Sequence, residues 1–351
     1  MKATTTGDAA GLPGVEMSRA GVVFGVLLLL MTVGGLVAYK ATGSLAVIGK
    51  VQATGALQPR FDLMAAGAGA RTLSYFNAVW PALLFGVLIS GAVRAFVSPR
   101  WLAGLFGGGR VRSQVVAGLA GAPLMLCSCC VAPVFTSVYE RSSRLAPSLA
   151  LMLAAPSLNP AALFLTFLLF GGRLGALRLL AAAACVLLTG VLAERFFKVN
   201  PAACPAGETL GSGGVTSVAG LAASFARSSL KVAVQTVPLI VAGVFLSMLI
   251  ARWLPVGWSG SGSAQVLAVL IVAAVAVPLA LPTFFEIPLA FLLLGAGMPA
   301  GAAVALLVAG PATNLPSLLT VGRSTDWRVS LLVGTSVWAL AAAAGLLAAF
   351  V

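Results

Sequence analysis

Two proline-interrupted motifs recur at one spacing, inside segments apolar enough to cross a membrane. The first reads Leu-Cys-Ser-Cys-Cys-Val-Ala-Pro and ends at Pro133; the second reads Leu-Pro-Thr-Phe-Phe-Glu-Ile-Pro and ends at Pro288, 155 residues later. Pro156 and Pro311 lie the same distance apart. In an internal duplication, matched interruptions of corresponding membrane segments are the best sequence indication of a transporter's binding site. The repeat therefore constrains both the fold and the location of the site.

Composition places the chain in a membrane. Of its 351 residues, 60% are hydrophobic, 8% are charged and none is histidine. Soluble domains carry about 25% charged residues, whereas the apolar runs here are long enough to span a bilayer. The 21 basic residues lie mostly at the ends of these runs, as the positive-inside rule requires. The net charge of +13 is thereby explained without nucleic-acid binding.

The apolar runs predict an all-α, polytopic membrane protein of about nine transmembrane segments, eight of them in two internal repeats of four. Residues 1–73 are expected to hold an N-terminal tail, a first helix at 20–39 and a connecting loop. The first membrane repeat is assigned to 74–197 and the second to 230–351. Between them, the Gly- and Ser-rich stretch 198–229 is typical of a flexible linker.

Four full spans in each repeat would give both halves the same orientation. The arginines favour this parallel arrangement, because Arg110 and Arg112 after the first span of repeat one would then be cytoplasmic together with Arg173 and Arg178 after its third span. If one broken segment is instead a re-entrant hairpin, the number of spans becomes odd and the repeats become inverted.

Four prolines predict where helices break. Pro133 and Pro156 in the first repeat, and Pro288 and Pro311 in the second, each remove a backbone hydrogen bond and clash with the preceding helical turn. Unwound backbone at membrane depth is tolerated only inside protein or beside a watery cavity, where its freed groups can bind a ligand. Kinked but continuous helices are the alternative.

Three cysteines, Cys127, Cys129 and Cys130, lie at the first predicted break. A helix puts Cys127 and Cys130 on one face, whereas an extended stretch puts Cys127 and Cys129 there. Either pair offers soft sulfur ligands, which prefer thiophilic metals or metalloids to hard cations. The alternative is three small residues in tight packing. The chain has no histidine and no second cysteine pair for a tetrahedral zinc site, so no resident metal or other cofactor is predicted.

At the second predicted break, Glu286 is the only acidic residue well inside an apolar run. Such a carboxylate is costly to bury, and it usually faces a cavity, pairs with a cation or relays protons. Glu286 is therefore predicted to couple transport to protons or to contact substrate, with a structural hydrogen bond as the alternative. Thr283 and Phe284 are assigned to the substrate site, Phe284 with packing as its alternative. Asn159 and Asn314 are predicted to contact substrate or to cap interrupted helices.

These motifs resemble a bacterial permease family that includes the ArsP-type exporters of trivalent organoarsenicals. The resemblance covers roughly residues 75–350 and rests on Cys127-Ser128-Cys129 followed by Pro133, on Ala155-Pro156 through Asn159-Pro160, and on Gly310-Pro311-Ala312-Thr313-Asn314. It implies a polytopic inner-membrane permease whose thiols, here Cys127 and Cys129, contact the transported species. Cys130 stands where the family is expected to carry glycine, so the substrate stays open.

The predicted function is secondary export of a soft, thiol-reactive solute, such as a trivalent organoarsenical, through a site between the repeats. The sequence contains no phosphate-binding loop, and the chain is not predicted to be an enzyme. Two alternatives are a membrane enzyme that passes electrons through its clustered thiols, and a permease for a small sulfur-containing anion attracted by arginines and helix ends. The expected partners are the bilayer of the bacterial inner membrane and a small solute. The sequence specifies neither the direction of transport nor the oligomeric state.

Overall fold

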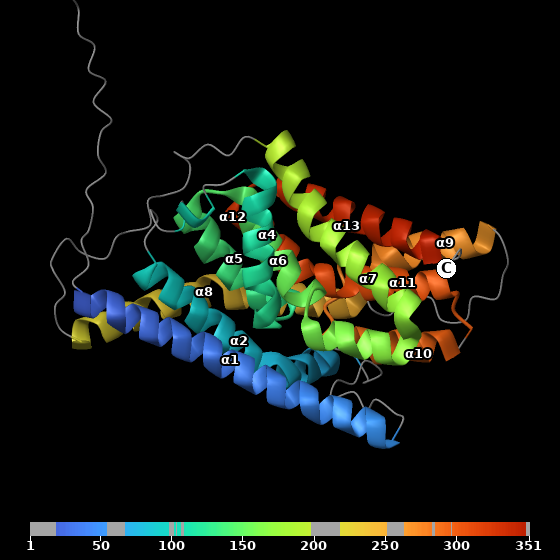
Figure 1. Cartoon of the computed structure of the whole chain (residues 1–351), viewed down its shortest axis with the longest axis horizontal. Helices are drawn as coiled ribbons and strands as arrows, with labels where there is room; N and C mark the ends of the chain where they lie inside the picture. Colours follow the sequence, from blue (N-terminus) through green and yellow to red (C-terminus); the bar gives the residue numbers. More distant parts are fainter. Residues whose placement is uncertain are drawn as a thin grey trace, which may run out of the picture.

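The computed structural model describes residues 19–54, 67–97, 102, 104–106, 109–197, 218–250, 263–282, 285–295 and 297–348. These residues are helical apart from short connections and contain no strand, which confirms the all-α prediction for this part of the chain (Figure 1). The helices are α1 (Arg19–Thr54), α2 (Ala68–Phe96), α4 (Arg110–Gly121), α5 (Ser128–Ser142), α6 (Leu145–Ser157), α7 (Pro160–Phe196), α8 (Val218–Ile250), α9 (Ser263–Ala276), α10 (Glu286–Gly295), α11 (Ala300–Ala312), α12 (Leu315–Ser324) and α13 (Trp327–Leu347), with a 3-10 turn η1 at Ala122–Leu124.

Five of the described helices, α1, α2, α7, α8 and α13, are long and apolar enough to cross a membrane. α11 and α12 together form a sixth candidate, because they meet at a bend of 44° and continue in one general direction. The nine predicted segments are not confirmed. The physical reason is that α4, α5, α9 and α10 have 12, 15, 14 and 10 residues, roughly 15–23 Å of helix, against about 30 Å of hydrocarbon.

The apolar run 114–139 is long enough for one span, but it folds back on itself. Arg144, just beyond α5, donates a hydrogen bond from Nη1 to the carbonyl oxygen of Phe106, which precedes α4 (3.0 Å). The outer ends of α4 and α5 therefore lie at one face of the bundle. The loop at 122–127 is the tip of this re-entrant pair, which we call the first hairpin.

α9 and α10 form the second hairpin, with its tip at residues 277–285. Val269 of α9 lies against Gly301 near the start of α11, whereas Glu286 at the start of α10 lies against Gly310 near the end of α11. α9 thus runs alongside α11 and α10 runs back against it. The tip reaches the break between α11 and α12, where the Leu315 amide donates a hydrogen bond to the Pro278 carbonyl (3.0 Å).

In each hairpin, the two helix ends far from the tip lie at one face of the bundle, and we say that the hairpin opens toward that face. The two hairpins open toward opposite faces. Thr136 in the second half of α5 contacts Ser324 at the end of α12 (Oγ1–Oγ 3.3 Å), so the first hairpin opens where α12 ends. The second hairpin opens where α11 begins, and α11 and α12 cross the bundle in one direction. In Figure 1, α5 and α12 accordingly lie toward one end of the long axis, and α9 and α10 toward the other. The two predicted repeats would therefore be inverted, and not parallel as the arginines favour, because each hairpin replaces a full span.

Basic residues gather where the first hairpin opens, and we call this end of the bundle the basic face. Two ion pairs lie there: Arg94 with Glu140 (2.7 Å), and Arg144 with Glu194 near the end of α7 (3.7 Å). The same face carries five further arginines at the ends of described helices: Arg112, Arg141, Arg195, Arg323 and Arg328.

Gly171 reverses the direction of the chain within α7. Its φ of 81° and ψ of 173° lie in a region that side chains with a Cβ avoid. Just beyond the bend, a Cβ at Gly175 would lie 2.5 Å from the ring of Phe167. A first arm (160–170) and a second arm (172–196) therefore pack side by side.

The bend corrects the predicted placement of Arg173. The second arm ends at the basic face, and roughly 33 Å of helix separates Arg173 from Arg195. Arg173 consequently lies at the opposite face and not with Arg110 and Arg112, because the third span of the first repeat ends there.

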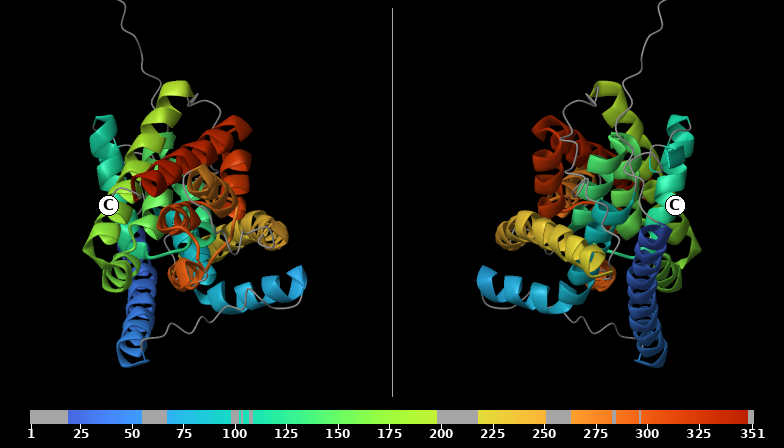
Figure 2. Two further views of the ribbon diagram at one scale, coloured as in Figure 1. Left: turned by 90° about the vertical axis from the view of Figure 1, so that its right-hand side faces the viewer. Right: turned by 90° about the vertical axis from the view of Figure 1, so that its left-hand side faces the viewer.

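α1 lies at the periphery of the bundle, where Figures 1 and 2 show it along one side. Only 11% of its most apolar window is buried, and its main packing partner is α2. α1 continues to Thr54, past the predicted end at residue 39, so Lys40 is part of the helix. α8 begins at Val218, and the remainder of the predicted linker, 198–217, lies outside the described residues. The domain boundaries stay a prediction.

Candidate functional site

The tip of the first hairpin connects the 3-10 turn after α4 to the start of α5, and its backbone is constrained at Met125. Met125 has φ 49° and ψ 29°, a left-handed conformation that is uncommon for a residue with a Cβ and persists where surrounding structure holds it. Leu126 then leads into Cys127, the extended N-cap residue of α5. The helix break therefore precedes Pro133, which lies inside α5 and does not end it.

The other predicted breaks are also displaced from their prolines. Pro156 and Pro311 lie in the last turns of α6 and α11, and the chain leaves the helix just after each. Pro288 lies in the first turn of α10, where a missing amide hydrogen costs nothing. The break itself is the tip before α10. Thr283 and Phe284 in that tip lie outside the described residues, and their assignment stays a prediction.

The three thiols of the first hairpin meet at one point. The sulfur of Cys127 is 2.7 Å from that of Cys130 and 3.1 Å from that of Cys129, and the remaining pair is 3.7 Å apart. All three cysteines are free and buried. The sequence leaves open which pair shares a face. In the structure all three share one side of the helix start. The extended backbone at Cys127 turns its side chain toward the first turn of α5, which carries Cys129 and Cys130.

We call these three sulfurs the thiol cluster. Its longest separation, 3.7 Å, matches the spacing around a bound soft atom, and its separations of 2.7 and 3.1 Å are shorter than that spacing. A soft atom bound at about 2.3 Å by several thiolates separates the sulfurs by roughly 3.5–4 Å. Thiolate is the form that binds, and the N-terminus of α5 favours negative charge beside Cys127. Lys40 of α1 also acts electrostatically on Cys127. The thiol cluster therefore has the donor chemistry to bind a thiophilic ion or metalloid.

Tyr75 completes the surroundings of the thiol cluster. Its hydroxyl group lies 2.8 Å from the sulfur of Cys129, and its side chain is fully buried. α2 approaches α5 this closely because Gly86 has no Cβ; a Cβ there would overlap the carbonyl oxygen of Cys130. Sequence reasoning missed both residues. The rarity of tyrosine, three in the chain, is the signal that singles out Tyr75.

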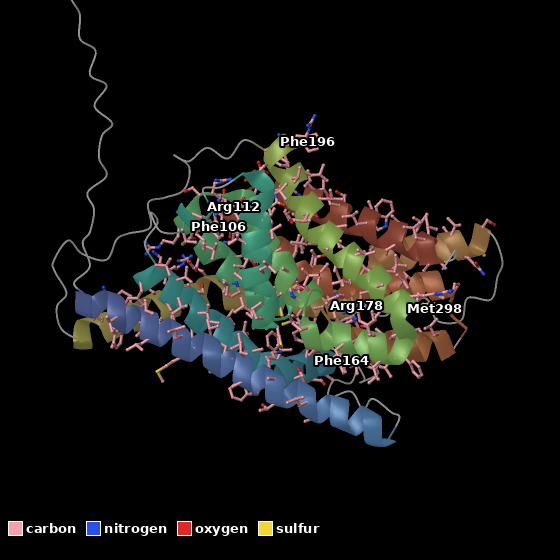
Figure 3. The ribbon with its side chains drawn as sticks, in the orientation of Figure 1. Phe106, Arg112, Phe164, Arg178, Phe196 and Met298 are labelled. Atoms are coloured by element: carbon pink, nitrogen blue, oxygen red, sulfur yellow. The ribbon has the colours of Figure 1, made fainter. Side chains whose placement is uncertain are left out.

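Glu286, at the start of α10, forms a buried ion pair with Arg178. The distance between its Oε1 and Nη2 of Arg178 is 3.0 Å, and the two side chains are 3% and 1% exposed. Arg178 belongs to the second arm of α7, and its Nη1 also donates a hydrogen bond to Thr166 on the first arm. Figure 3 shows Arg178 well inside the bundle. The prediction that Arg178 lies at a cytoplasmic helix end is therefore wrong.

This ion pair joins the two repeats. Removing two charges from water costs several kcal/mol per ion, which is recovered only through good geometry, so loss of one partner is far more harmful than loss of both. Within the described residues, the polar contact of Glu286 is with Arg178 and not with the thiols. The carboxylate of Glu286 is thus held by Arg178 of α7 and makes no contact with the thiol cluster.

Asn159 and Asn314 both cap the helices that restart after a break. Asn159 Oδ1 accepts from the amides of Ala161 and Ala162 (3.1 and 3.4 Å), and Asn314 Oδ1 accepts from the amide of Ser317 (2.9 Å). Each side chain is fully buried, and each Nδ2 lacks a hydrogen-bond partner among the described residues. Capping occupies the oxygen only. A buried amide donor is left at the corresponding position of each repeat.

The chain matches the family described as predicted permease (ArsP_1) over residues 65–350, which include both hairpins and the thiol cluster. The protein belongs to this permease family. Its membership and its long apolar helices establish a multi-pass membrane protein with a transporter role.

Three relatives of this permease are named only as UPF0718 proteins. It is 27% identical over 264 residues to protein YraQ of Escherichia coli (strain K12), covering 75% of each chain. It is 30% identical over 119 residues to protein MJ0584 of Methanocaldococcus jannaschii, covering 33% of each chain. It is 33% identical over 122 residues to protein YcgR of Bacillus subtilis (strain 168), covering 34% of this chain and 42% of the relative. No solved structure matches the permease significantly.

Proposed function

We propose that this permease exports a soft, thiol-reactive solute by secondary transport across the bacterial inner membrane, with trivalent organoarsenicals as the substrate class. The observation that carries the proposal is the thiol cluster, three buried sulfurs within 3.7 Å of one another at the tip of a re-entrant hairpin. Sulfur ligands select soft ions, whereas hard cations prefer oxygen. A transporter of this family with such a cluster is suited to a thiophilic cargo.

Binding would be a ligand exchange at arsenic. A monoorganyl arsenical carries two hydroxyl groups, and each As–O bond is replaced by an As–S bond while the thiol proton leaves with hydroxide as water. Two thiols satisfy this arsenic, and the third remains to displace either of them. Such an exchange keeps binding strong enough to admit the solute and labile enough to release it, as transport requires.

Glu286 would couple transport to protons. Protonation of its carboxylate removes the charge that holds Arg178, and so loosens the link between the second hairpin and the bent α7. Transporters with inverted repeats alternate access by moving one repeat against the other around a fixed site. The buried Nδ2 groups of Asn159 and Asn314 are proposed to donate to polar groups of the passing solute.

The positive-inside rule assigns the basic face to the cytoplasm. The thiol cluster then lies at the tip of a hairpin that opens toward the cytoplasm, and the Glu286 pair at the tip of one that opens away from it. An exporter loads from the cytoplasmic side, so the proposed orientation places the sulfur ligands on the hairpin that opens toward the source of the cargo.

The test is energised uptake of phenylarsenoxide by everted membrane vesicles. The unmodified permease is expected to accumulate the arsenical, and Cys127→Ser with Cys129→Ser is expected to abolish accumulation. Cys185→Ser is the matched control, because Cys185 is a buried thiol on α7 outside the thiol cluster. Unchanged uptake in the double variant would eliminate the role of the thiols.

A further inference from the structure

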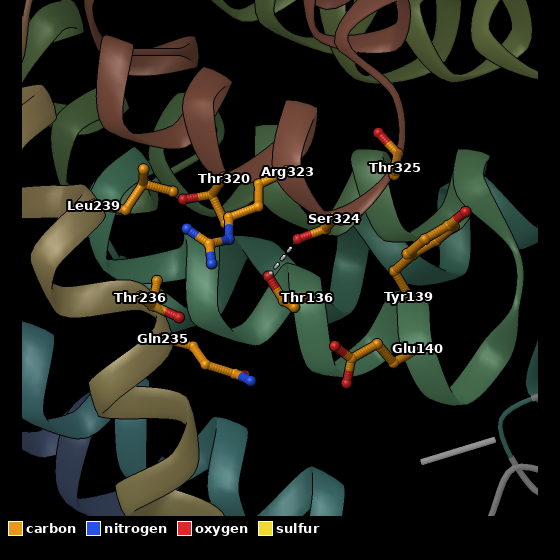
Figure 4. Close-up of a pocket in the computed structure, with 10 residues that line it drawn as sticks. All are labelled: Thr136, Tyr139, Glu140, Gln235, Thr236, Leu239, Thr320, Arg323, Ser324 and Thr325. Atoms are coloured by element: carbon orange, nitrogen blue, oxygen red, sulfur yellow. Dashed lines mark hydrogen bonds between the residues drawn. The ribbon is translucent and has the colours of Figure 1, made fainter. Parts of the chain in front are cut away.

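A polar cavity of about 420 Å³ lies between the two repeats at the basic face. α5 of the first repeat contributes Thr136 and Glu140, while α8 and α12 of the second contribute Gln235, Thr320 and Arg323 among others. Figure 4 shows the Arg323 side chain extending from α12 toward α8, and the Glu140 carboxylate turned toward the same space. Neither the family match nor the thiol chemistry accounts for this cavity.

Along α5, the cavity lies between the basic face and the thiol cluster. Thr136 follows Cys127 by nine residues on the same helix, which is roughly 13 Å along its axis. The cavity wall contains the Thr136–Ser324 contact between the repeats (3.3 Å). A movement of one repeat against the other must therefore change the shape of the cavity. This position is better suited to a route by which solute reaches the thiol cluster from the basic face than to an empty packing defect.

The charge around the cavity is positive. Glu140 is its acidic lining residue, and Arg94, Lys231 and Arg141 all act electrostatically on that carboxylate. Within the described part of the chain, no carboxylate pairs with Arg323. The ends of α5 and α12 add partial negative charge that offsets only part of this excess. An anionic group entering the cavity would meet more cations than the resident carboxylate neutralises.

The lining also offers hydrogen-bond donors. Thr136, Thr320 and Ser324 contribute hydroxyl groups, and Gln235 contributes an amide. Guanidinium groups bind carboxylates and oxyanions through paired, charge-assisted hydrogen bonds, and hydroxyl groups can satisfy the remaining oxygen lone pairs. The combination is suited to one carboxylate or oxyanion group.

We propose that this cavity is the entrance through which the permease takes up its solute, and that Arg323 makes it selective for solutes bearing a carboxylate or oxyanion group. The inference rests on the proposed function for the path to the thiol cluster, but the anion selectivity of the cavity is independent of the arsenical chemistry. A solute that carries both a soft atom and a carboxylate would bind at the two places in turn. Its carboxylate would bind in the cavity first, and its soft atom would then bind to the thiols.

The test measures the electrostatic potential of the cavity directly. In everted vesicles, Gln235→Cys is reacted with an anionic sulfonatoethyl and with a cationic trimethylammonioethyl methanethiosulfonate, and each rate is divided by that of a free thiol. The chain without this substitution, whose described cysteines are buried, gives the background. The anionic reagent is expected to be favoured, and Arg323→Gln is expected to lower the anionic-to-cationic ratio about tenfold, as removal of one nearby charge implies.

Arg328→Gln is the matched control, because Arg328 is an exposed arginine on the same face that does not line the cavity. It should leave the ratio within about twofold. The proposal is overturned if the cationic reagent is favoured, if Arg323→Gln leaves the ratio unchanged, or if Gln235→Cys reacts in intact cells and not in everted vesicles.

A transport experiment separates this inference from the proposed function. Arg323→Gln should raise the half-saturating concentration of a carboxyphenyl arsenical about tenfold and leave that of neutral phenylarsenoxide unchanged. An equal effect on both would contradict anion selection. If the unmodified permease accumulates neither arsenical, the proposed function fails, while the reagent ratio still decides the nature of the cavity.

Discussion

At the tip of the first hairpin three thiols contact one another and a tyrosine hydroxyl, whereas at the tip of the second a carboxylate is paired with an arginine from the other repeat. The two tips carry the motifs that recur 155 residues apart, on hairpins that point in opposite directions. Thiols can be buried at little cost because they are neutral when protonated, and they remain free to react. A carboxylate at the same depth needs a cation, so it ties the repeats together. Under the proposed function, one tip binds the cargo and the other controls how the two halves of the bundle move.

The largest expected effect comes from leaving the second tip with an unpaired charge. Glu286→Ala should destabilise the permease by about 3–5 kcal/mol, because Arg178 stays buried without its partner. The measurement is unfolding in mixed detergent micelles. Adding Arg178→Met should restore most of the loss, and Cys127→Ala at the first tip should cost no more than about 1.5 kcal/mol. If the single and double variants are equally unstable, the ion pair does not hold the second tip.

Loss of the thiols should reverse this pattern, with little effect on folding and a large effect on transport. Cys127→Ser with Cys129→Ser is expected to lower arsenical uptake at least 100-fold, about 2.7 kcal/mol in transport free energy. Its unfolding midpoint should stay close to that of Cys185→Ser, the control thiol on α7. A loss of folded protein that matches the loss of transport would mean that the cysteines serve packing.

The contact between α2 and the first tip should be intolerant of added volume. Gly86→Ala would push a methyl group into the carbonyl oxygen of Cys130 and is expected to cost about 1–3 kcal/mol, with slower transport. Gly172→Ala is the control, because a Cβ there meets nothing within 4 Å. Unfolding in micelles reports both variants. Equal stability of the two would show that α2 does not press on the thiol cluster.

The smallest effects are expected at the matched asparagines. Asn159→Ala or Asn314→Ala removes a helix cap and should cost about 1 kcal/mol of stability. Asn→Asp at either position keeps the capping oxygen and replaces the free amide donor. The aspartate variants should therefore lose less stability than the alanine variants, while transport falls. If the aspartate variants transport normally, the asparagines act as caps alone.

Residue chemistry at the first site could be predicted from the sequence, because it depends on short local spacings. Cys127, Cys129 and Cys130 lie within four residues, so the sequence predicts a pair of sulfur ligands, but it leaves open whether all three meet. Capping by Asn159 and Asn314 is one of the two roles that the sequence allows. The thiols meet as soon as the chain changes from extended to helical backbone at Cys127. The family resemblance rests on the same local motifs, and the family match confirms it.

The direction of the chain could not be predicted in this way. An apolar run of 26 residues, 114–139, has the same composition whether it spans the membrane or turns back at 122–127. The turn depends on the left-handed Met125 and on packing against α6, which no periodicity records. Arg178 was misplaced for a related reason, because its partners Thr166 and Glu286 become neighbours only through the bend at Gly171 and the folding of the other repeat.

The most direct test of the contrast between the two tips is arsenic X-ray absorption of the purified permease loaded with phenylarsenoxide. The proposed exchange predicts two sulfur neighbours at about 2.3 Å in the unmodified protein and in Glu286→Gln, and fewer than two in Cys127→Ser with Cys129→Ser. Oxygen neighbours alone in the unmodified protein, or an unchanged sulfur count in the double cysteine variant, would contradict a sulfur site at the first tip.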